Sequence, residues 1–349
     1  MAVPGYADDP EAQVPVNPMK PLHGEILRTL LYYDIWRYPL TARELFVFLP
    51  VPLASLEEFL DNVRRDGVGQ DVSVEGSYYF VRGRSPALVA ERREKEQHAK
   101  RLWARARISM HIIKRFPFVR GIFVSGDLSK NATNRDSDVD FFVVTERNRL
   151  WIARTLLILF KKVFLLNKKK YFCLNSFASS DHLCLDEQNI FLATEVAHLK
   201  PLYNSDLFFE YLEANSWIKR FFPNFSIRDL PLPRANNHRS RLQRVFEIPF
   251  SWIPSDRLDT FLLHKMKTVW ARRYPEYDDE TRERIFRCTK HESRAYAGNF
   301  EDKVLALYDS KLREFGVSND QDLCCRPPGA IARRDACKDL QATDSSANA

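Results

Sequence analysis

The stretch VSGDLSK at positions 124–130, followed by NRDSDVDFFVV at 134–144, decides how this chain is interpreted. The apolar run from Val119 to Ser125 predicts a buried strand, and the run from Ser137 to Thr145 predicts a second one. A polar loop of about ten residues joins the two strands. The pattern therefore predicts a glycine turn at the end of one strand and acidic residues at the start of the next.

Two acidic residues of the second strand are the candidate metal ligands. Side chains two positions apart in a strand point to the same side, so Asp138 and Asp140 project together while Val139 faces the opposite side. Carboxylates held this close repel each other unless a cation lies between them. Hard oxygen ligands with open positions suit Mg²⁺, which would also bridge the phosphates of a nucleoside triphosphate (NTP).

The glycine, the spacer and the Asp-x-Asp strand resemble the nucleotidyltransferase superfamily that shares the polymerase β palm fold. Gly126 matches the first position of the family pattern, and Ser137–Phe141 matches the second part. The order of the whole chain is similar to that of uncharacterised bacterial nucleotidyltransferase-domain proteins. The resemblance implies an α+β fold with a palm-like mixed sheet, and Mg²⁺-dependent transfer of a nucleoside monophosphate from NTP to an acceptor. The acceptor stays open between a small molecule, RNA and protein.

The resemblance also assigns roles to the residues of the loop. Ser125 and Gly126 would form the phosphate loop, with Asp138 and Asp140 as the metal-binding catalytic residues. The family's second loop residue is Gly or Ser, whereas this chain has Asp127. A carboxylate at that position repels phosphate unless it turns outward, binds metal or is offset by a cation such as Lys130.

A third carboxylate, on a later strand, often acts as general base or metal ligand in this superfamily. In the strand predicted for Tyr171–Ala178, the best-placed residue is Asn175, an amide that can bind metal but cannot accept a proton. Asp181, just past that strand, is the fallback candidate. Glu195 is interpreted as an acid on a helix surface, with a position at the cleft as the alternative.

The N-terminal part of the chain predicts three short helices and a hairpin, which together outline a winged-helix-like domain at 22–83. Thr41 with Glu44, and Ser55 with Glu58, are capping boxes that open the second and third helices. The third helix carries a net charge of −2, whereas helices that read DNA usually carry the reverse balance. Protein interaction or dimerisation is therefore favoured over DNA binding for this domain.

A basic connector helix is expected at 84–116. Between Arg82 and Arg120 there are twelve Lys and Arg against three Glu, a net charge of +9. A solvated connector is the first interpretation, and a surface facing nucleic acid or phosphate is the second. The remaining predicted parts are a flexible leader at 1–21, the nucleotidyltransferase core at 117–205, a helical C-terminal domain at 206–316 and a disordered tail at 317–349.

The composition is that of a globular protein, with 349 residues, 45% of them hydrophobic, and a formal net charge of +7. No apolar run is long enough to span a bilayer, so no membrane partner is expected and the location is predicted to be cytoplasmic. Six cysteines without a CxxC pair are predicted to be free thiols. The function alternatives are a catalytically weakened nucleotide-binding regulator and a winged-helix DNA-binding protein.

Overall fold

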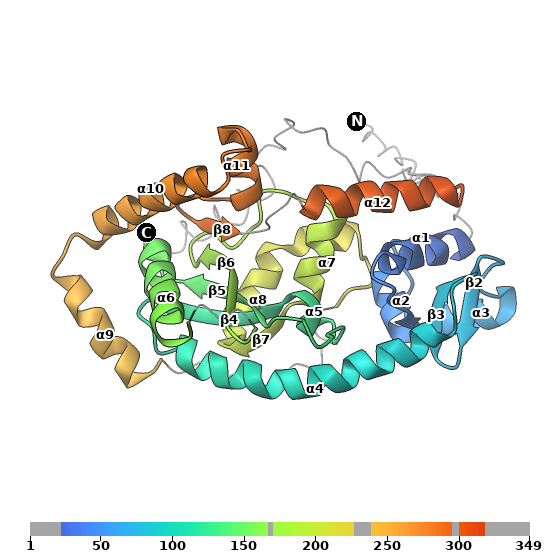
Figure 1. Cartoon of the computed structure of the whole chain (residues 1–349). Helices are drawn as coiled ribbons and strands as arrows, with labels where there is room; N and C mark the ends of the chain where they lie inside the picture. The colour runs from blue at the N-terminus through green and yellow to red at the C-terminus, as the bar shows by residue number, and fades with distance from the viewer. Residues whose placement is uncertain (1–21, 167–169, 227–238, 295–299, 318–349) are drawn as a thin grey trace, which may run out of the picture.

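The chain mixes helices and strands in a computed structural model that describes residues 22–166, 170–226, 239–294 and 300–317 (Figure 1). This described part contains twelve α-helices and two sheets, one of three strands and one of five. The mixture of helix and strand expected from the sequence is confirmed. The predicted leader at 1–21, and the predicted tail from residue 318 onward, lie outside the described residues.

The N-terminal unit contains three helices and an antiparallel sheet in the order β1-β3-β2. Both predicted caps are present: the Thr41 hydroxyl accepts a hydrogen bond from the Glu44 amide, and the Ser55 hydroxyl accepts one from the Glu58 amide. The elements are α1 (Leu22–Asp34), β1 (Leu40–Thr41), α2 (Ala42–Phe48), α3 (Leu56–Asp66), β2 (Val72–Glu75) and β3 (Tyr78–Val81).

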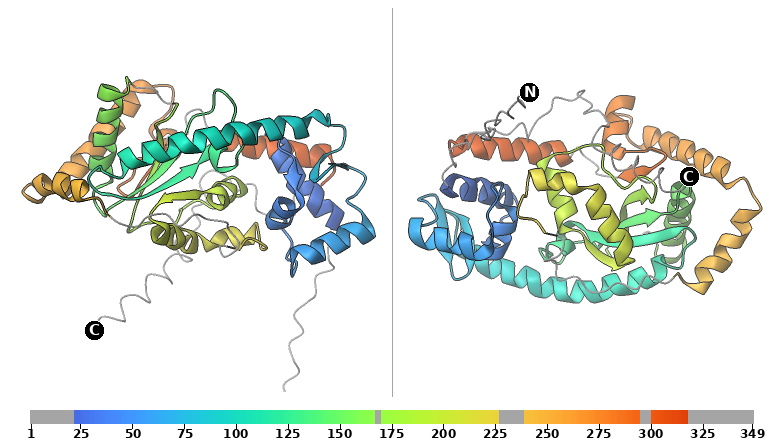
Figure 2. Two further views of the ribbon diagram at one scale, coloured as in Figure 1. Left: turned by 90° about the horizontal axis from the view of Figure 1, so that it is seen from below. Right: turned by 180° about the vertical axis from the view of Figure 1, so that it is seen from behind.

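Helix α4 (Ala87–Ile113) follows and runs along both the N-terminal unit and the larger sheet (Figures 1 and 2). It is the helix predicted as a connector, but one of its faces belongs to the core. Ala99, Leu102 and Ala106 are buried among residues of the larger sheet. Only the opposite face is solvated, so the connector interpretation holds for half of the helix surface.

The larger sheet has the order β7-β4-β5-β6-β8 and is mixed, because β5 pairs with β4 antiparallel and with β6 parallel. Helices cover both of its faces. Its first part consists of β4 (Val119–Ser125), α5 (Gly126–Ser129), β5 (Asp140–Thr145), α6 (Leu150–Phe164), β6 (Cys173–Ser179), α7 (Ile190–His198), β7 (Lys200–Tyr203), α8 (Ser205–Ala214) and the 3-10 helix η1 (Ser216–Arg220).

Strand β5 shows why the sequence has an unbroken apolar run there. Phe141 and Val143 pack into the cluster that contains residues of α4, α6 and α10, whereas Phe142 and Val144 pack into the cluster that contains residues of α7 and α8. A strand buried on both faces needs apolar side chains at successive positions. The second cluster also contains Ile26 and Leu30 of α1, so the N-terminal unit and the larger sheet share one hydrophobic core.

The C-terminal part was expected to be helical, and it also supplies a strand. Strand β8 pairs with β6 and forms an edge of the larger sheet. Helix α12 returns to the N-terminal unit, where the Tyr308 hydroxyl donates to the backbone oxygen of Arg28 over 3.2 Å. The elements are α9 (Arg241–Ser251), α10 (Ser255–Arg273), α11 (Asp279–Phe286), β8 (Glu292–Arg294) and α12 (Phe300–Glu314).

Two predictions concern a membrane-spanning helix and the state of the cysteines. Within the described ranges, no helix combines the length and apolar character needed to cross a bilayer. Cys173 and Cys288 are free and buried as expected, but Cys184 is disulfide-bonded, so the prediction of free thiols is wrong at that residue. Disulfides are rare in a reducing cytoplasm, and the cytoplasmic location stays a prediction.

Candidate active site

The glycine turn and the acidic strand predicted from the sequence lie together, where β4 ends and β5 begins. Ser125, the last residue of β4, pairs with Asp140, the first residue of β5. Gly126 follows with a φ of +64°, in the left-handed region that favours glycine. A Cβ atom at Gly126 would lie 2.5 Å from Oδ2 of Asp140. The glycine is therefore required both by the turn and by the close approach of the carboxylate.

Asp140 is held from the neighbouring strand β6. The side-chain amide of Asn175 donates to Oδ1 of Asp140 over 2.5 Å, and the Cys173 thiol donates to the Asn175 oxygen over 3.0 Å. The β5–β6 register skips Asn175: Phe141 pairs with Leu174, and Phe142 pairs with Ser176. Bulges of this kind redirect a side chain next to a site. Asn175 thus reaches Asp140, as its predicted position in the third strand requires.

Three further carboxylates surround Asp140 and change its acidity. The pKa of Asp140 is raised to about 7, mainly by burial and further by the negative charges of Asp127, Asp138 and Glu195, against the lowering effect of a hydrogen bond with Cys173. The carboxylate is thus crowded by like charges. A bound cation would offset this repulsion.

Asp138 and Asp140 alternate with Val139 as predicted, although the strand itself begins later than expected. Strand β5 starts at Asp140 rather than at Ser137. Val139 is fully buried in the core, whereas Asp138 and Asp140 are partly exposed. The backbone of Val139 still bonds to the segment beside it, because its oxygen accepts from the Cys173 amide over 3.1 Å. This pairing keeps the extended geometry at Asp138.

Asp127 is explained by the loop that it closes. The Ser137 hydroxyl donates to Oδ2 of Asp127 over 3.0 Å, and the backbone oxygen of Asp127 accepts from the Ala132 amide over 2.9 Å. The Asn134 amide in turn donates to the Ser137 hydroxyl over 3.0 Å. Asp127 therefore ties the start of the loop to its end, a structural task that a Gly at this position could not perform.

Lys130 and Glu195 form an ion pair at the edge of the site. The ammonium of Lys130 lies 2.5 Å from Oε1 of Glu195, and both side chains are more than four-fifths buried. Glu195 stands on α7 and contributes to the electrostatic field at Asp140. It is thus largely buried and close enough to Asp140 to raise its pKa, rather than the surface acid that the sequence favoured. The sequence alone could not indicate this ion pair, because 65 residues separate Lys130 from Glu195.

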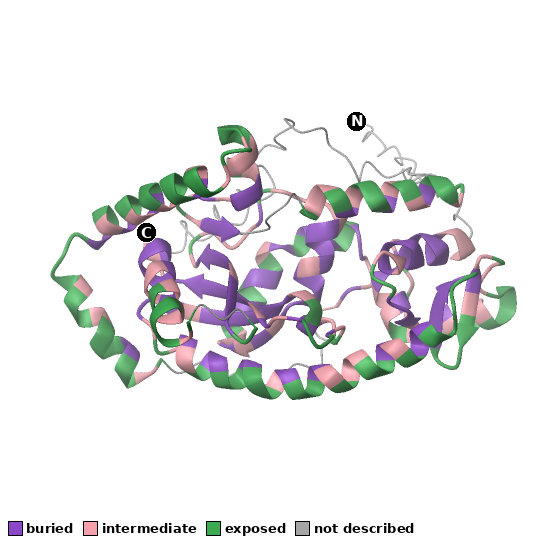
Figure 3. Cartoon of the chain, in the orientation of Figure 1, coloured by how far each residue is buried: buried purple, intermediate pink, exposed green. Residues whose placement is uncertain are grey.

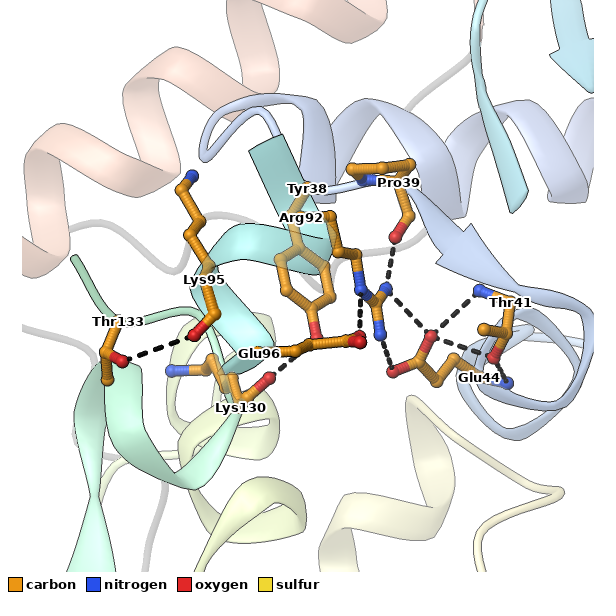
Figure 4. A network of polar contacts seen from close by, with 9 residues as sticks. All are labelled: Tyr38, Pro39, Thr41, Glu44, Arg92, Lys95, Glu96, Lys130 and Thr133. Carbon is orange, nitrogen blue, oxygen red and sulfur yellow. Dashed lines mark hydrogen bonds and ion pairs between the residues drawn. The ribbon is translucent and has the colours of Figure 1, made fainter. Parts of the chain in front are cut away.

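The N-terminal unit reaches this edge of the site through a polar network (Figure 4). The Tyr38 hydroxyl donates to the backbone oxygen of Lys130 over 2.6 Å. Arg92 of α4 lies 4.1 Å from the centre of the Tyr38 ring and donates to Glu44, the N3 residue of the capping box, over 2.7 Å. The predicted phosphate loop is thereby fixed to α2 and α4 as well as to the sheet.

Asp181, the fallback for the third carboxylate, is not brought to the site. It follows Ser179, which pairs with Thr145 at the far end of β5, whereas Asp140 pairs with Cys173 at the near end. Six residue steps of about 3.3 Å along β6 separate the two ends by about 20 Å. Asp181 instead pairs with Arg147, with a shortest distance of 3.3 Å.

The fit of the site to a magnesium ion can be judged from its donor atoms. Within the described ranges, no three His, Cys, Asp or Glu side chains are already gathered as ligands of one metal ion. Magnesium in nucleotide sites is commonly bound by one or two carboxylates, with phosphate oxygens and water completing the octahedron. Asp138 and Asp140 offer such a pair, and a cation held between them would offset the like charges that help to raise the pKa of Asp140.

The pKa of Asp140 leads to a pH prediction for ligand binding. A cation binds the ionised carboxylate, so protons compete with it below a pKa of about 7. Between pH 5 and 7 we expect the dissociation constant of Mg²⁺-NTP to fall by about tenfold per pH unit, and above pH 7.5 we expect it to level off. Calorimetric titration across this range checks the prediction, and an affinity that does not change from pH 5 to 8 would contradict it.

The structure thus gathers Ser125, Gly126, Asp127, Lys130, Asp138, Asp140 and Asn175 in one place and leaves out Asp181. Sequence analysis missed Cys173 and Tyr38. Neither lies in a motif, and only the strand register and the packing of α4 bring them near the site. None of the known family models, curated proteins or solved structures compared with this chain matches it.

Proposed function

We propose that the protein is a Mg²⁺-dependent nucleotidyltransferase with a palm-like core, which transfers a nucleoside monophosphate from NTP to an acceptor hydroxyl. The observation that carries the proposal is the crowding of Asp127, Asp138 and Glu195 around the partly buried Asp140, directly beside the Gly126 turn. Such an arrangement is costly for folding unless a ligand compensates it, and strongly perturbed carboxylates of this kind concentrate at functional sites.

The roles of the residues follow from their positions. Asp138 and Asp140 would hold Mg²⁺, which when bound neutralises phosphate charge and stabilises the attacking and leaving oxygens. Asn175 orients Asp140 through its hydrogen bond. The Gly126 turn lets the triphosphate approach the backbone because no side chain projects there. These groups position the α-phosphorus for in-line attack.

Lys130 and Glu195 supply the remaining charge and the base. The triphosphate competes with Glu195 for the Lys130 ammonium, which then neutralises phosphate charge. The freed Glu195 carboxylate accepts the proton of the acceptor hydroxyl as its oxygen bonds to the α-phosphorus and pyrophosphate leaves. Glu195 thus takes the part of the general base that Asn175 cannot play.

A second candidate is a nucleotide-binding regulator with weak or no catalysis. Two observations favour it: Asp127 adds negative charge where a triphosphate must approach, and an amide occupies the third carboxylate position at Asn175. In that case the N-terminal unit, with its winged-helix-like order of three helices and a hairpin, would respond to nucleotide binding. The hydrogen bond between Tyr38 and Lys130 would transmit the change from the site to this unit. The acidic balance of α3 argues against direct DNA reading by this unit.

Transfer of label separates the two candidates. The protein is incubated with Mg²⁺ and each of the four α-³²P-labelled NTPs, in the presence of RNA, a mixture of small hydroxyl compounds, or no acceptor. The enzyme predicts Mg²⁺-dependent release of pyrophosphate and label in an acceptor or in the protein itself. Nucleotide binding without any incorporation would reject the enzyme and leave the regulator.

A further inference from the structure

The solvent-facing side of α4 carries positive charge that the site does not use. No Asp or Glu occurs from Gln97 to Gly126. Figure 3 shows exposed positions along the outer side of α4, and several of the exposed residues in this run are basic. We name these residues the α4 basic stripe, which consists of Lys100, Arg101 and Arg107 of α4 and of Arg115, two residues past the end of the helix. At about 1.5 Å per residue the stripe extends over about 22 Å along the helix axis.

The charges of the stripe are not neutralised within the described part of the chain. None of its four members forms an ion pair there, whereas exposed Arg64 and Arg65 of α3 pair with Asp61 and Asp66 at distances of 2.5 and 3.1 Å. Four like charges along α4 and just past its end repel each other, and a polyanion that lies across them lowers their electrostatic energy. The stripe is therefore built to attract a partner rather than to stabilise the fold.

An exposed aromatic ring lies next to the stripe. Arg105 follows Arg101 by one helical turn, and its guanidinium lies 4.4 Å from the centre of the Tyr171 ring. Tyr171 is 37% exposed, and its backbone oxygen accepts from the Ser109 hydroxyl of α4 over 2.6 Å. Aromatic rings beside basic side chains are stacking platforms for unpaired bases. A duplex offers no free base face to such a ring along its length.

Tyr171 also connects the stripe with the candidate active site. It lies two residues before Cys173, which pairs with Asp140 across the β5–β6 register. Lys170, the next residue toward the loop, donates to the backbone oxygen of Arg135 over 2.8 Å, which places two more basic residues at this end of the sheet. A strand bound along α4 can therefore extend past Tyr171 toward the carboxylates.

We propose that the α4 basic stripe binds the phosphodiester backbone of a single-stranded nucleic acid, with a base stacked on Tyr171, and directs the end of the strand to the carboxylate site. The role of the nucleic-acid strand as acceptor rests on the proposed function. Binding of the strand to the stripe does not depend on that function. An anionic membrane fits less well, because Ile108 is the only large apolar side chain exposed on α4. At 3.4 Å per phosphate, a stacked strand would place about six phosphates along the stripe.

Fluorescence anisotropy of labelled 20-nucleotide RNA and DNA strands, measured at several salt concentrations, tests the proposal. The stripe variant changes all four members to Gln. A matched control removes four exposed basic side chains from α9 and α10, namely Arg241, Arg244, Arg257 and Lys265. We expect the stripe variant to bind at least about 30-fold more weakly, and the slope of log affinity against log salt to fall by about 3, while the control retains wild-type binding.

The outcomes separate this surface from the proposed function. Equal losses in both variants, unchanged binding by the stripe variant, tighter binding of a 20-base-pair duplex, or binding to anionic phospholipid vesicles in place of the strands would each overturn the proposal. The RNA and DNA arms show which sugar the strand carries. Mg²⁺-NTP binding by the stripe variant should match the wild type, so failure of the nucleotide site in the wild type is recognised independently of strand binding.

Discussion

Asp140→Asn is expected to lower the rate of nucleotidyl transfer by about 10³-fold, because the transition state loses a metal ligand that supplies several kcal/mol. The same change is expected to stabilise the fold. The raised pKa of about 7 means that the folded protein holds a proton between pH 4 and 7 that the unfolded chain has released. The free energy of unfolding of the wild type therefore falls as the pH rises through this window.

At pH 8 the variant should unfold with a free energy about 2 kcal/mol higher than the wild type, since it has no partly buried charge at this position to maintain. Urea denaturation and label transfer at this pH measure both effects. Asp181→Asn is the matched control, because it makes the same change at the far end of β6 and should leave the transfer rate unchanged. Loss of both activity and stability in Asp140→Asn would indicate a structural aspartate and contradict the assigned role.

Gly126→Ala is expected to destabilise the protein by about 3 kcal/mol and to weaken Mg²⁺-NTP binding more than tenfold. The backbone φ of +64° costs an alanine about 1 kcal/mol. The remainder comes from the new Cβ, which would lie 2.5 Å from Oδ2 of Asp140 and force the carboxylate out of its position. The carboxylate displaced from Asn175 loses a hydrogen bond as well.

Gly76→Ala separates the two contributions. Gly76 lies in the turn of the β2–β3 hairpin with a φ of +60°, but a Cβ atom there would meet nothing within 4 Å. Its loss of stability should therefore be about 1 kcal/mol, with unchanged ligand binding. Urea denaturation of both variants gives the difference that belongs to the Asp140 contact, and equal destabilisation would show that this contact is unimportant.

The local parts of the fold could be predicted from the sequence because local patterns determine them. Strand β4 has its expected limits of Val119 and Ser125, and the capping box of Thr41 and Glu44 opens α2 where predicted. Helix α4 likewise falls within its expected range. In each case the signal is a periodicity or a pair of residues three apart, which requires no knowledge of the rest of the chain.

The parts that could not be predicted depend on contacts between distant residues. Tyr38 and Lys130 are 92 residues apart, and no pattern near either indicates their hydrogen bond. The three-residue strand β8 is too short to give an alternation signal, and it exists because β6 offers it an edge. Asp181 was a candidate because it follows β6 in sequence, but the direction of the strand carries it to the opposite end from Asp140.

Calorimetric titration of a non-hydrolysable NTP analogue, with and without Mg²⁺, tests the central claim most directly. The wild type and Asp138→Ala/Asp140→Ala are compared at pH 8, where Asp140 is ionised. The carboxylate site predicts binding by the wild type that requires Mg²⁺ and that disappears in the double variant, which urea denaturation should show to be folded. Absence of binding by the wild type, or equal binding by the folded double variant, would contradict the assignment of Asp138 and Asp140 as the metal-nucleotide site.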